Sequence, residues 1–188
     1  MTSEREKMLR GMPYDTTDAE LVGERLRARQ LTYAFNHAPP EDEDARRRAL
    51  AALVAHCGER VRIEPPFRCD YGTNLWLGDD VYMNFNCIVL DCASVRIGQR
   101  VLVGPNVQIV TATHPLAVAD RFTGRELALP VTIDDDVWLG AGVIVCPGVT
   151  IGAGSVVGAG SVVVSDVPVG VVCVGNPCRV VRKLTNVE

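Results

Sequence analysis

The chain has 188 residues and lacks the features that mark membrane and nucleic-acid-binding proteins. No apolar run approaches the roughly 20 residues that a membrane-spanning helix needs. The charged N-terminal stretch MTSEREKMLRGM lacks the apolar centre of a signal peptide. The 23 Asp and Glu outnumber the 19 Lys and Arg, and the net charge of −4 gives no general affinity for nucleic acids or anionic membranes. These absences predict a cytoplasmic protein with neither nucleic acid nor membrane as a partner.

The sequence has no closely spaced cysteine pair and few histidines, which argues against disulfides and metal sites. The 7 cysteines are an odd number, include no CxxC pair and have no His nearby at zinc-ligand spacing. We therefore expect reduced thiols that pack as small hydrophobic residues, and no bound metal. Of the 3 histidines, His37 and His56 lie at the ends of expected helices, where capping is an ordinary role.

A six-residue repeat dominates the C-terminal half of the chain. Read in sixes from Ile133, the sequence is IDDDVW, LGAGVI, VCPGVT, IGAGSV, VGAGSV and VVSDVP, and Val169 opens the next hexad by the same count. An aliphatic residue opens each hexad, and Val or Ser takes its fifth place. Neither a helix nor a plain alternating strand has this period or returns Gly so often. The repeat predicts a parallel β-helix of short strands and turns, with Gly at turns of positive φ.

The phase of the repeat can be followed towards the N-terminus. Leu77 and Ile97 are 20 residues apart, three sixes plus two, which predicts a small bulge at one corner. Ile97 and Ile133 are 36 residues apart, so the phase survives, although residues 115–130 (PLAVADRFTGRELALP) contain no convincing hexad. We predict that 115–130 form a loop that leaves the β-helix and re-enters in register. Loops of this length in a compact domain tend to be functional.

Residues 1–58 have a different composition, with few Gly and many Glu, Arg, Leu and Ala. Apolar residues at helical spacing and acids after Pro39-Pro40 predict helices at 3–10, 18–36 and 41–56. Because a β-helix must cover its terminal coil, we expect these helices to cap it. Three hexads per coil would give a triangular prism with flat, apolar sides, which favours a homotrimer.

His114 ends the hexad IVTATH directly before the predicted loop. A titratable imidazole at the base of a long loop is a common setting for a general base, because its pKa lies near neutrality. The alternative is a solvent-exposed turn histidine without a catalytic role.

Six segments carry a resemblance to a known family: RLRARQLTYAFNH, EPPFRCDYGTN, YMNFN, TATHP, PVTIDDDVWLGAGVIVCPGVTIG and GNPCRVV. Together they resemble the maltose/galactoside O-acetyltransferases of the hexapeptide-repeat acyltransferase superfamily, and most closely the maltose branch. The likeness runs from Glu6 to about Leu184. It implies a mainly β fold, a left-handed parallel β-helix at 59–174, with an N-terminal α-helical cap segment at 1–58 and a CoA-contacting tail at 175–188.

The resemblance also implies an activity and its residues. Acetyl would pass from acetyl-CoA directly to a sugar hydroxyl in a ternary complex, with His114 of the THP motif as general base. Asn84 of YMNFN would stabilise the developing negative charge, although a structural Asn in a coil turn is the plain alternative.

Acceptor and donor residues follow from the same comparison. The acceptor side would comprise Asp15, Asp70, Tyr82, Asn84 and Cys92. Galactoside-type enzymes carry Asp where Cys92 stands, which favours the maltose/glucose branch, and ordinary turn chemistry is the alternative for Asp15 and Asp70. The donor side matches positions that contact the pantetheine arm and the CoA phosphates: Ala141, Ala159, Val164, Ser165, Arg179, Arg182 and Lys183. For the three basic residues, a solvated helix face is the alternative.

Three other functions fit a triangular β-helix. A γ-type carbonic anhydrase needs three zinc-binding histidines, and the repeat region has only His114. A non-catalytic trimeric scaffold would not need a His at a loop base. A hexapeptide acyltransferase acting on a galactoside, amino sugar or xenobiotic alcohol is the remaining alternative.

Overall fold

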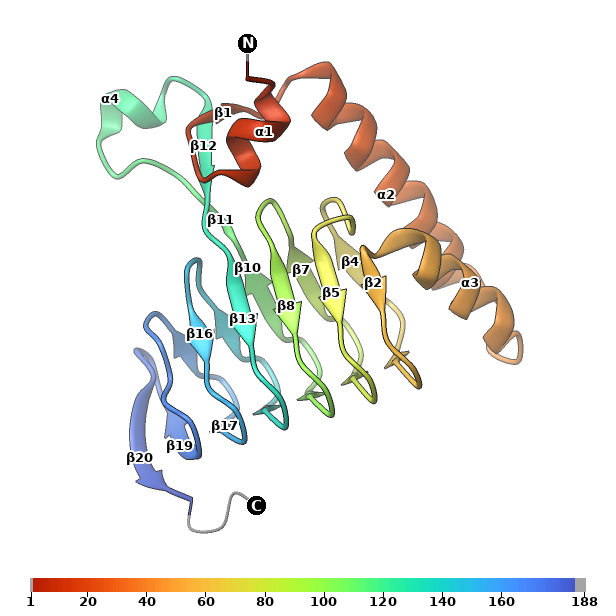
Figure 1. Cartoon of the computed structure of the whole chain (residues 1–188), viewed down its shortest axis with the longest axis vertical. Helices are drawn as coiled ribbons and strands as arrows, with labels where there is room; N and C mark the ends of the chain where they lie inside the picture. Colours follow the sequence, from red (N-terminus) through yellow and green to blue (C-terminus); the bar gives the residue numbers. More distant parts are fainter. Residues whose placement is uncertain (1, 185–188) are drawn as a thin grey trace.

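A computed structural model describes residues 2–184 as a left-handed parallel β-helix with helices at its N-terminal end (Figure 1). The strands stack from β2 near α2 and α3 to β19 and β20 near the C-terminus. Within the described residues, the helices are too short or too polar to cross a membrane.

Three stacked sheets form the walls of the prism, which we number in the order in which each coil visits them. Wall 1 contains β2 (His56–Cys57), β5 (Leu75–Leu77), β8 (Val95–Ile97), β13 (Val131–Ile133) and β16 (Thr150–Ile151). Wall 2 contains β3 (Arg62–Ile63), β6 (Tyr82–Met83), β9 (Leu102–Val103), β14 (Trp138–Leu139), β17 (Val156–Val157), β19 (Val171–Val174) and, antiparallel, β20 (Arg179–Lys183). Wall 3 contains β4 (Arg68–Cys69), β7 (Ile88–Leu90), β10 (Gln108–Val110), β15 (Ile144–Val145) and β18 (Val162–Val163).

The aliphatic residues that open the hexads form the core. Ile97, Ile133 and Ile151 are stacked in register on wall 1, and all three are buried. Parallel strands about 4.8 Å apart place such residues directly above one another, so their side chains exclude water along the whole prism. The predicted fold is confirmed.

Glycine has two separate roles in the hexads. Gly140 and Gly152, in the second place, do not have positive φ, so that part of the prediction is wrong for them. A Cβ on either would lie 2.6 Å from a backbone nitrogen of the next coil, which means that glycine is required for close stacking. Positive φ occurs two residues later, at Gly142 and Gly154.

Two phase predictions have different outcomes. The paired residues Cys57, Leu77 and Ile97 confirm coils of 20 residues, and the extra residues lie where the chain passes from wall 3 to wall 1. The prediction that Val169 opens a hexad is wrong, because Val169 is 64% exposed. Val167 pairs with Ile151 instead, since the last coil is shortened at the same corner.

The N-terminal helices are α1 (Glu4–Leu9), α2 (Ala19–His37) and α3 (Glu43–Leu53). Asp18 and Asp42 cap α2 and α3 by accepting hydrogen bonds from first-turn N–H groups. Buried Phe35 of α2 and Leu53 of α3 belong to the same core as the coils. The third helix is shorter than predicted, and His56 already lies in β2.

The segment between β10 and β13 leaves the prism and returns in register, as predicted. It contains β11 (Ala112–Thr113), α4 (Val118–Arg121) and β12 (Arg125–Ala128), and we call residues 111–130 the excursion. Its β12 is the central strand of a small sheet, between β11 and β1 (Tyr14–Asp15). The N-terminal segment therefore braces the excursion, and both project beyond the coils in Figure 1.

Candidate active site

The predicted site residues fall into two groups at different corners of the prism. Asp70 and Cys92 follow wall 3 strands at the corner between walls 3 and 1, which we call the 3–1 corner, and His114 follows β11, where the excursion leaves this corner. Tyr82 and Asn84 lie on wall 2 and at the corner between walls 2 and 3, the 2–3 corner. A single chain therefore does not bring the predicted base and the predicted amide donor together.

His114 lies directly after β11, with its side chain 55% exposed. Its Nε2 is 3.7 Å from Oε1 of Glu126 on β12. The other carboxylate oxygen of Glu126 accepts a hydrogen bond from the Tyr14 hydroxyl at 3.0 Å. Burial raises the pKa of Tyr14 well above its ordinary value, so this hydroxyl remains a donor throughout the physiological range.

Asp70 and Cys92 are neighbours on successive coils. The Cys92 thiol donates to Oδ2 of Asp70 at 3.4 Å. Burial raises the pKa of the Asp70 carboxyl, and the Cys92 thiol and the Arg25 guanidinium partly offset this. Arg25 itself donates to the Tyr71 hydroxyl at 2.6 Å.

Asp91 connects successive 20-residue coils at the 3–1 corner. Its carboxylate is fully buried and accepts hydrogen bonds from the backbone N–H groups of Asp70, Tyr71 and Asn74. Burial raises the pKa of Asp91 to about 7, although these donors act in the opposite direction. Asp91 therefore fixes the backbone that carries Asp70.

Asp15 lies near this group but is engaged in its own turn. Its Oδ1 accepts from the Thr17 N–H at 2.8 Å and from the Thr17 hydroxyl at 2.7 Å, which lowers the pKa of Asp15. Side chains alternate along a strand, so Asp15 and Tyr14 point to opposite faces of the small sheet. This geometry favours the turn role for Asp15.

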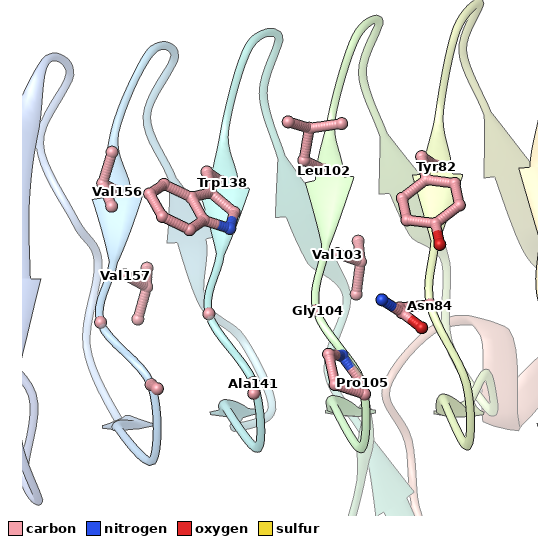
Figure 2. Close-up of a pocket in the computed structure, with 13 residues that line it drawn as sticks. Tyr82, Asn84, Leu102, Val103, Gly104, Pro105, Trp138, Ala141, Val156 and Val157 are labelled. Atoms are coloured by element: carbon pink, nitrogen blue, oxygen red, sulfur yellow. The ribbon is translucent and has the colours of Figure 1, made fainter.

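The second group borders an apolar groove of about 570 Å³ on the outer face of wall 2 (Figure 2). Successive strands place Tyr82, Leu102, Trp138 and Val156 in one row by their pairing register. Trp138 and Leu102 are 52% and 49% exposed. Solvent-exposed apolar surface of this extent indicates a binding site.

Asn84 supplies the groove with a hydrogen-bond donor. It occupies the hexad position held by Gly104 and Gly140 on the following coils, as the shared backbone hydrogen-bond pattern shows. Its Oδ1 accepts from the Phe85 N–H at 2.7 Å, which orients the amide. Among residues 2–184 no hydrogen bond uses its Nδ2 group, and Figure 2 shows this group on the side facing Val103.

The groove fits a thin, extended ligand. Ala141 and Ala159 line it, and Gly140 cannot carry a Cβ because it would collide with backbone of the next coil, so this part of the edge has only small residues. The groove thus exposes backbone groups to which a pantetheine arm can bind closely. Val164 and Ser165 lie elsewhere, after β18 at the 3–1 corner.

The basic tail continues wall 2. Arg179, Arg182 and Lys183 belong to β20, a strand rather than a helix, and all three are exposed. Arg182 pairs with Val172, which pairs with Val156, so a guanidinium extends the row of groove residues. Guanidinium groups at the end of an extended groove suit phosphates.

Comparisons with known proteins agree with this geometry. Residues 7–58 match the maltose acetyltransferase hexapeptide capping motif, and residues 130–165 match the bacterial transferase hexapeptide (six repeats). A galactoside O-acetyltransferase of Escherichia coli is 39% identical over 166 residues, covering 88% of this chain and 82% of the relative. The solved structure of a maltose O-acetyltransferase from Clostridium difficile has a TM-score of 0.97 at 44% identity and covers 98% of both chains. A galactoside acetyltransferase in complex with coenzyme A has a TM-score of 0.95 at 38% identity, covering 98% of this chain and 92% of that one.

A hexapeptide prism with a loop-borne His and a narrow groove edged by backbone defines a hexapeptide-repeat acyltransferase. Within that class, the chain belongs to the maltose and galactoside O-acetyltransferase family. It is an acetyl-CoA-dependent O-acetyltransferase. This excludes the carbonic anhydrase and scaffold alternatives.

Sequence reasoning missed Glu126 and Tyr14 beside His114, and Arg25 beside Tyr71 and Asp70. Arg25 was visible only as part of an amphipathic helix, and Tyr14 as one residue beside an expected turn. Glu126 faces His114 because a hairpin across residues 112–128 sets position 126 opposite position 114. That hairpin has no tight-turn motif, so the pairing could not be read from the sequence.

Proposed function

We propose that the chain transfers acetyl from acetyl-CoA to a hydroxyl of a maltose- or glucose-type sugar, in sites formed between copies of a homotrimer. The observation that carries this proposal is the division of the site residues between two corners of one prism. A second copy that sets its groove and Asn84 against the 3–1 corner of the first would complete one site. The remaining corner of each copy would serve the next site around the ring.

The outer faces of the walls support this assembly. Wall 3 presents Ile88, Ile144 and Val162 outward, in one row with Arg68 and Gln108, and wall 2 presents the groove row. Wall 1 presents Arg96, Thr132 and other polar residues. A cyclic trimer buries two walls of each copy and leaves wall 1 in water. Exposed Leu116 and Phe122 on the excursion would add apolar contact with a neighbour.

Acetyl-CoA supplies an activated acetyl group, and residues of this chain hold it. Ala141 and Ala159 leave the groove edge open to the pantetheine arm. Arg182, together with Arg179 and Lys183, would bind the phosphates through charge-assisted hydrogen bonds. Val164 and Ser165 would contact the arm from the neighbouring copy, because they share the 3–1 corner with His114.

His114 then acts on the acceptor. Its neutral imidazole takes the proton of a sugar hydroxyl, which is too weak an acid to ionise unaided, as the oxygen attacks the thioester carbonyl. The Asn84 amide of the neighbouring copy donates to the carbonyl oxygen as negative charge develops there. The C–S bond of the thioester then breaks, and the CoA sulfur leaves as a thiol with the proton that His114 had taken. Asp70 and Tyr82 would hold the sugar, with Cys92 orienting the Asp70 carboxylate.

A mixing experiment tests the shared site. H114A and N84A are each expected to lose activity, by about 10²–10⁴-fold for His114, measured as CoA release with maltose or glucose. When the two inactive variants are co-expressed, random trimers regain about a quarter of the wild-type activity, because one interface in four pairs an intact His114 with an intact Asn84. Trimers that regain nothing, or a monomer in sedimentation, contradict the proposal.

The same assay distinguishes the acceptors. Turnover of galactosides, amino sugars or simple alcohols without turnover of maltose and glucose would assign the chain to the alternative acceptor class. Retained acetyl transfer in H114A would instead remove His114 from the mechanism.

A further inference from the structure

Three side chains from separate strands form one row across the small sheet of the excursion. Tyr14 on β1 is directly opposite Glu126 on β12. The β11–β12 pairs Ala112–Ala128 and Thr113–Leu127 set Glu126 opposite His114 when the register is continued by one residue. Directly opposed side chains of an antiparallel pair lie on the same face, so all three project together.

The carboxylate of Glu126 is fixed within this row. Oε2 accepts the Tyr14 hydroxyl at 3.0 Å, and Tyr14 is fully buried in a cluster with Met8, Cys92 and Ala128. Oε1 is thereby directed at His114 Nε2, at 3.7 Å. The Glu126 side chain is 25% exposed, so the fixed carboxylate can still be reached by a ligand.

A distance of 3.7 Å is too long for a direct hydrogen bond between the two groups. Both nevertheless face the same side of the small sheet, where the acceptor would approach His114. A carboxylate can only accept hydrogen bonds. It therefore matches a second hydroxyl of the acceptor, since the reacting hydroxyl must give its own proton to His114.

We propose that Glu126, anchored by Tyr14, binds a hydroxyl adjacent to the one that is acetylated, so that the enzyme selects acceptors with two neighbouring hydroxyls. This inference rests on the proposed function, because it assigns to Glu126 a partner on the sugar held at His114. Simple monohydroxylic alcohols leave the carboxylate without a donor and are poor acceptors. Glu126 is a specificity residue that acts beside the catalytic base.

The test compares methyl α-glucoside with its monodeoxy analogues, at saturating acetyl-CoA. For the wild type, one analogue gives no product because it lacks the acetylated hydroxyl. Another loses about 10- to 150-fold in kcat/KM, the range expected for a hydrogen bond to a charged group. E126A loses the same factor on the parent glucoside and nothing further on that second analogue.

Three readouts separate binding from a structural effect. E126Q, which keeps the shape and an acceptor oxygen, falls between the wild type and E126A on the parent glucoside. In Y14F, kcat/KM on the parent glucoside falls only a few-fold, because the Glu126 carboxylate remains but is less firmly held. The deoxy analogue that lacks the hydroxyl bound by Glu126 shows no further loss. The KM for acetyl-CoA stays at its wild-type value in all three variants.

The outcomes are distinguishable. The role of Glu126 is overturned if E126A and E126Q lose kcat/KM equally on the parent glucoside and on every analogue. It is also overturned if neither variant loses kcat/KM on the parent. Both outcomes leave the proposed function intact. If the wild type acetylates none of the glucosides, the proposed sugar acceptor itself is wrong, and the inference falls with it.

Discussion

At the scale of single residues, glycine is required where two coils of the β-helix touch, but it is not required in the N-terminal helices. Gly140 cannot carry a Cβ without displacing the backbone at Ala159. Gly23, by contrast, lies within α2 and has open space around it. The same residue type is thus essential in a coil and unfavourable in a helix.

We predict opposite effects of alanine at these two positions. Gly23→Ala should stabilise the protein by about 0.5–1 kcal/mol, because it restricts the unfolded chain and favours the helix. Gly140→Ala should destabilise it, since the nearest atoms are backbone of the next coil. Thermal unfolding at fixed protein concentration measures both. A Gly140→Ala protein as stable as wild type would show that the coils can separate at little cost.

Asp91 predicts a pH dependence of stability. Its pKa is about 7 in the folded protein and near 4 when unfolded, so between these values the folded state binds more protons than the unfolded state. Its contribution to stability is therefore greatest at low pH and falls as the pH rises towards 7. The raised pKa of Asp70 acts in the same direction.

Urea unfolding at pH 5 and pH 8 checks this prediction with Asp91→Asn. The variant should be less stable than wild type at pH 5, because the Asn NH₂ group is a donor and cannot accept a hydrogen bond from the backbone N–H group that it faces. The difference should narrow at pH 8, where the wild-type carboxylate has ionised. A difference that widens with pH would contradict the assignment.

At the scale of elements, the excursion depends on the N-terminal segment. Met8 of α1 is fully buried in the cluster beneath β12, whereas Met12 is 45% exposed. Met8→Ala should cost about 2–5 kcal/mol and loosen the strand that carries Glu126. It should make the excursion more sensitive to protease and lower kcat. Met12→Ala is the matched control and should change neither.

The hexads made the walls predictable, because each repeat specifies its own strand and turn. The small sheet was not predictable, since β1 pairs with β12 across more than a hundred residues and neither strand has an alternating pattern long enough to detect. Val169 was misplaced for a similar reason: a corner can lose two residues while the strands on either side keep their aliphatic pattern. His114 was singled out because it ends a hexad directly before the loop, whereas Ala141 and Ala159 were named from the family resemblance and do line the groove.

At the scale of the whole molecule, the sequence could not show that His114 and Asn84 lie at different corners. The corner at which a residue lies is known only once the length of each coil is known. Here two coils have 20 residues, one contains the excursion and the last is shortened. In the proposed trimer, these two corners would form two halves of a site, so that assembly would be required for activity.

We predict that charge on wall 3 abolishes activity through assembly. Ile144→Arg places a guanidinium on the outer face of wall 3, and Thr132→Arg places one on the polar wall 1. The first should yield a folded monomer without acetyl transfer, and the second an active trimer. Sedimentation and circular dichroism measure both. An Ile144→Arg protein that remains trimeric would contradict the proposed packing of wall 3.

The last strand of the chain has a consequence that concerns solubility. A parallel solenoid resembles a short piece of fibril, since each end presents unpaired backbone groups onto which another copy could add. Here α2 and α3 lie beside the first coil, while β20 runs antiparallel along β19 and the Cys178 N–H pairs with the Val162 carbonyl. The reversed strand offers an incoming parallel coil the wrong hydrogen-bonding pattern. The strand that carries Arg179 and Arg182 thus opposes end-to-end polymerisation.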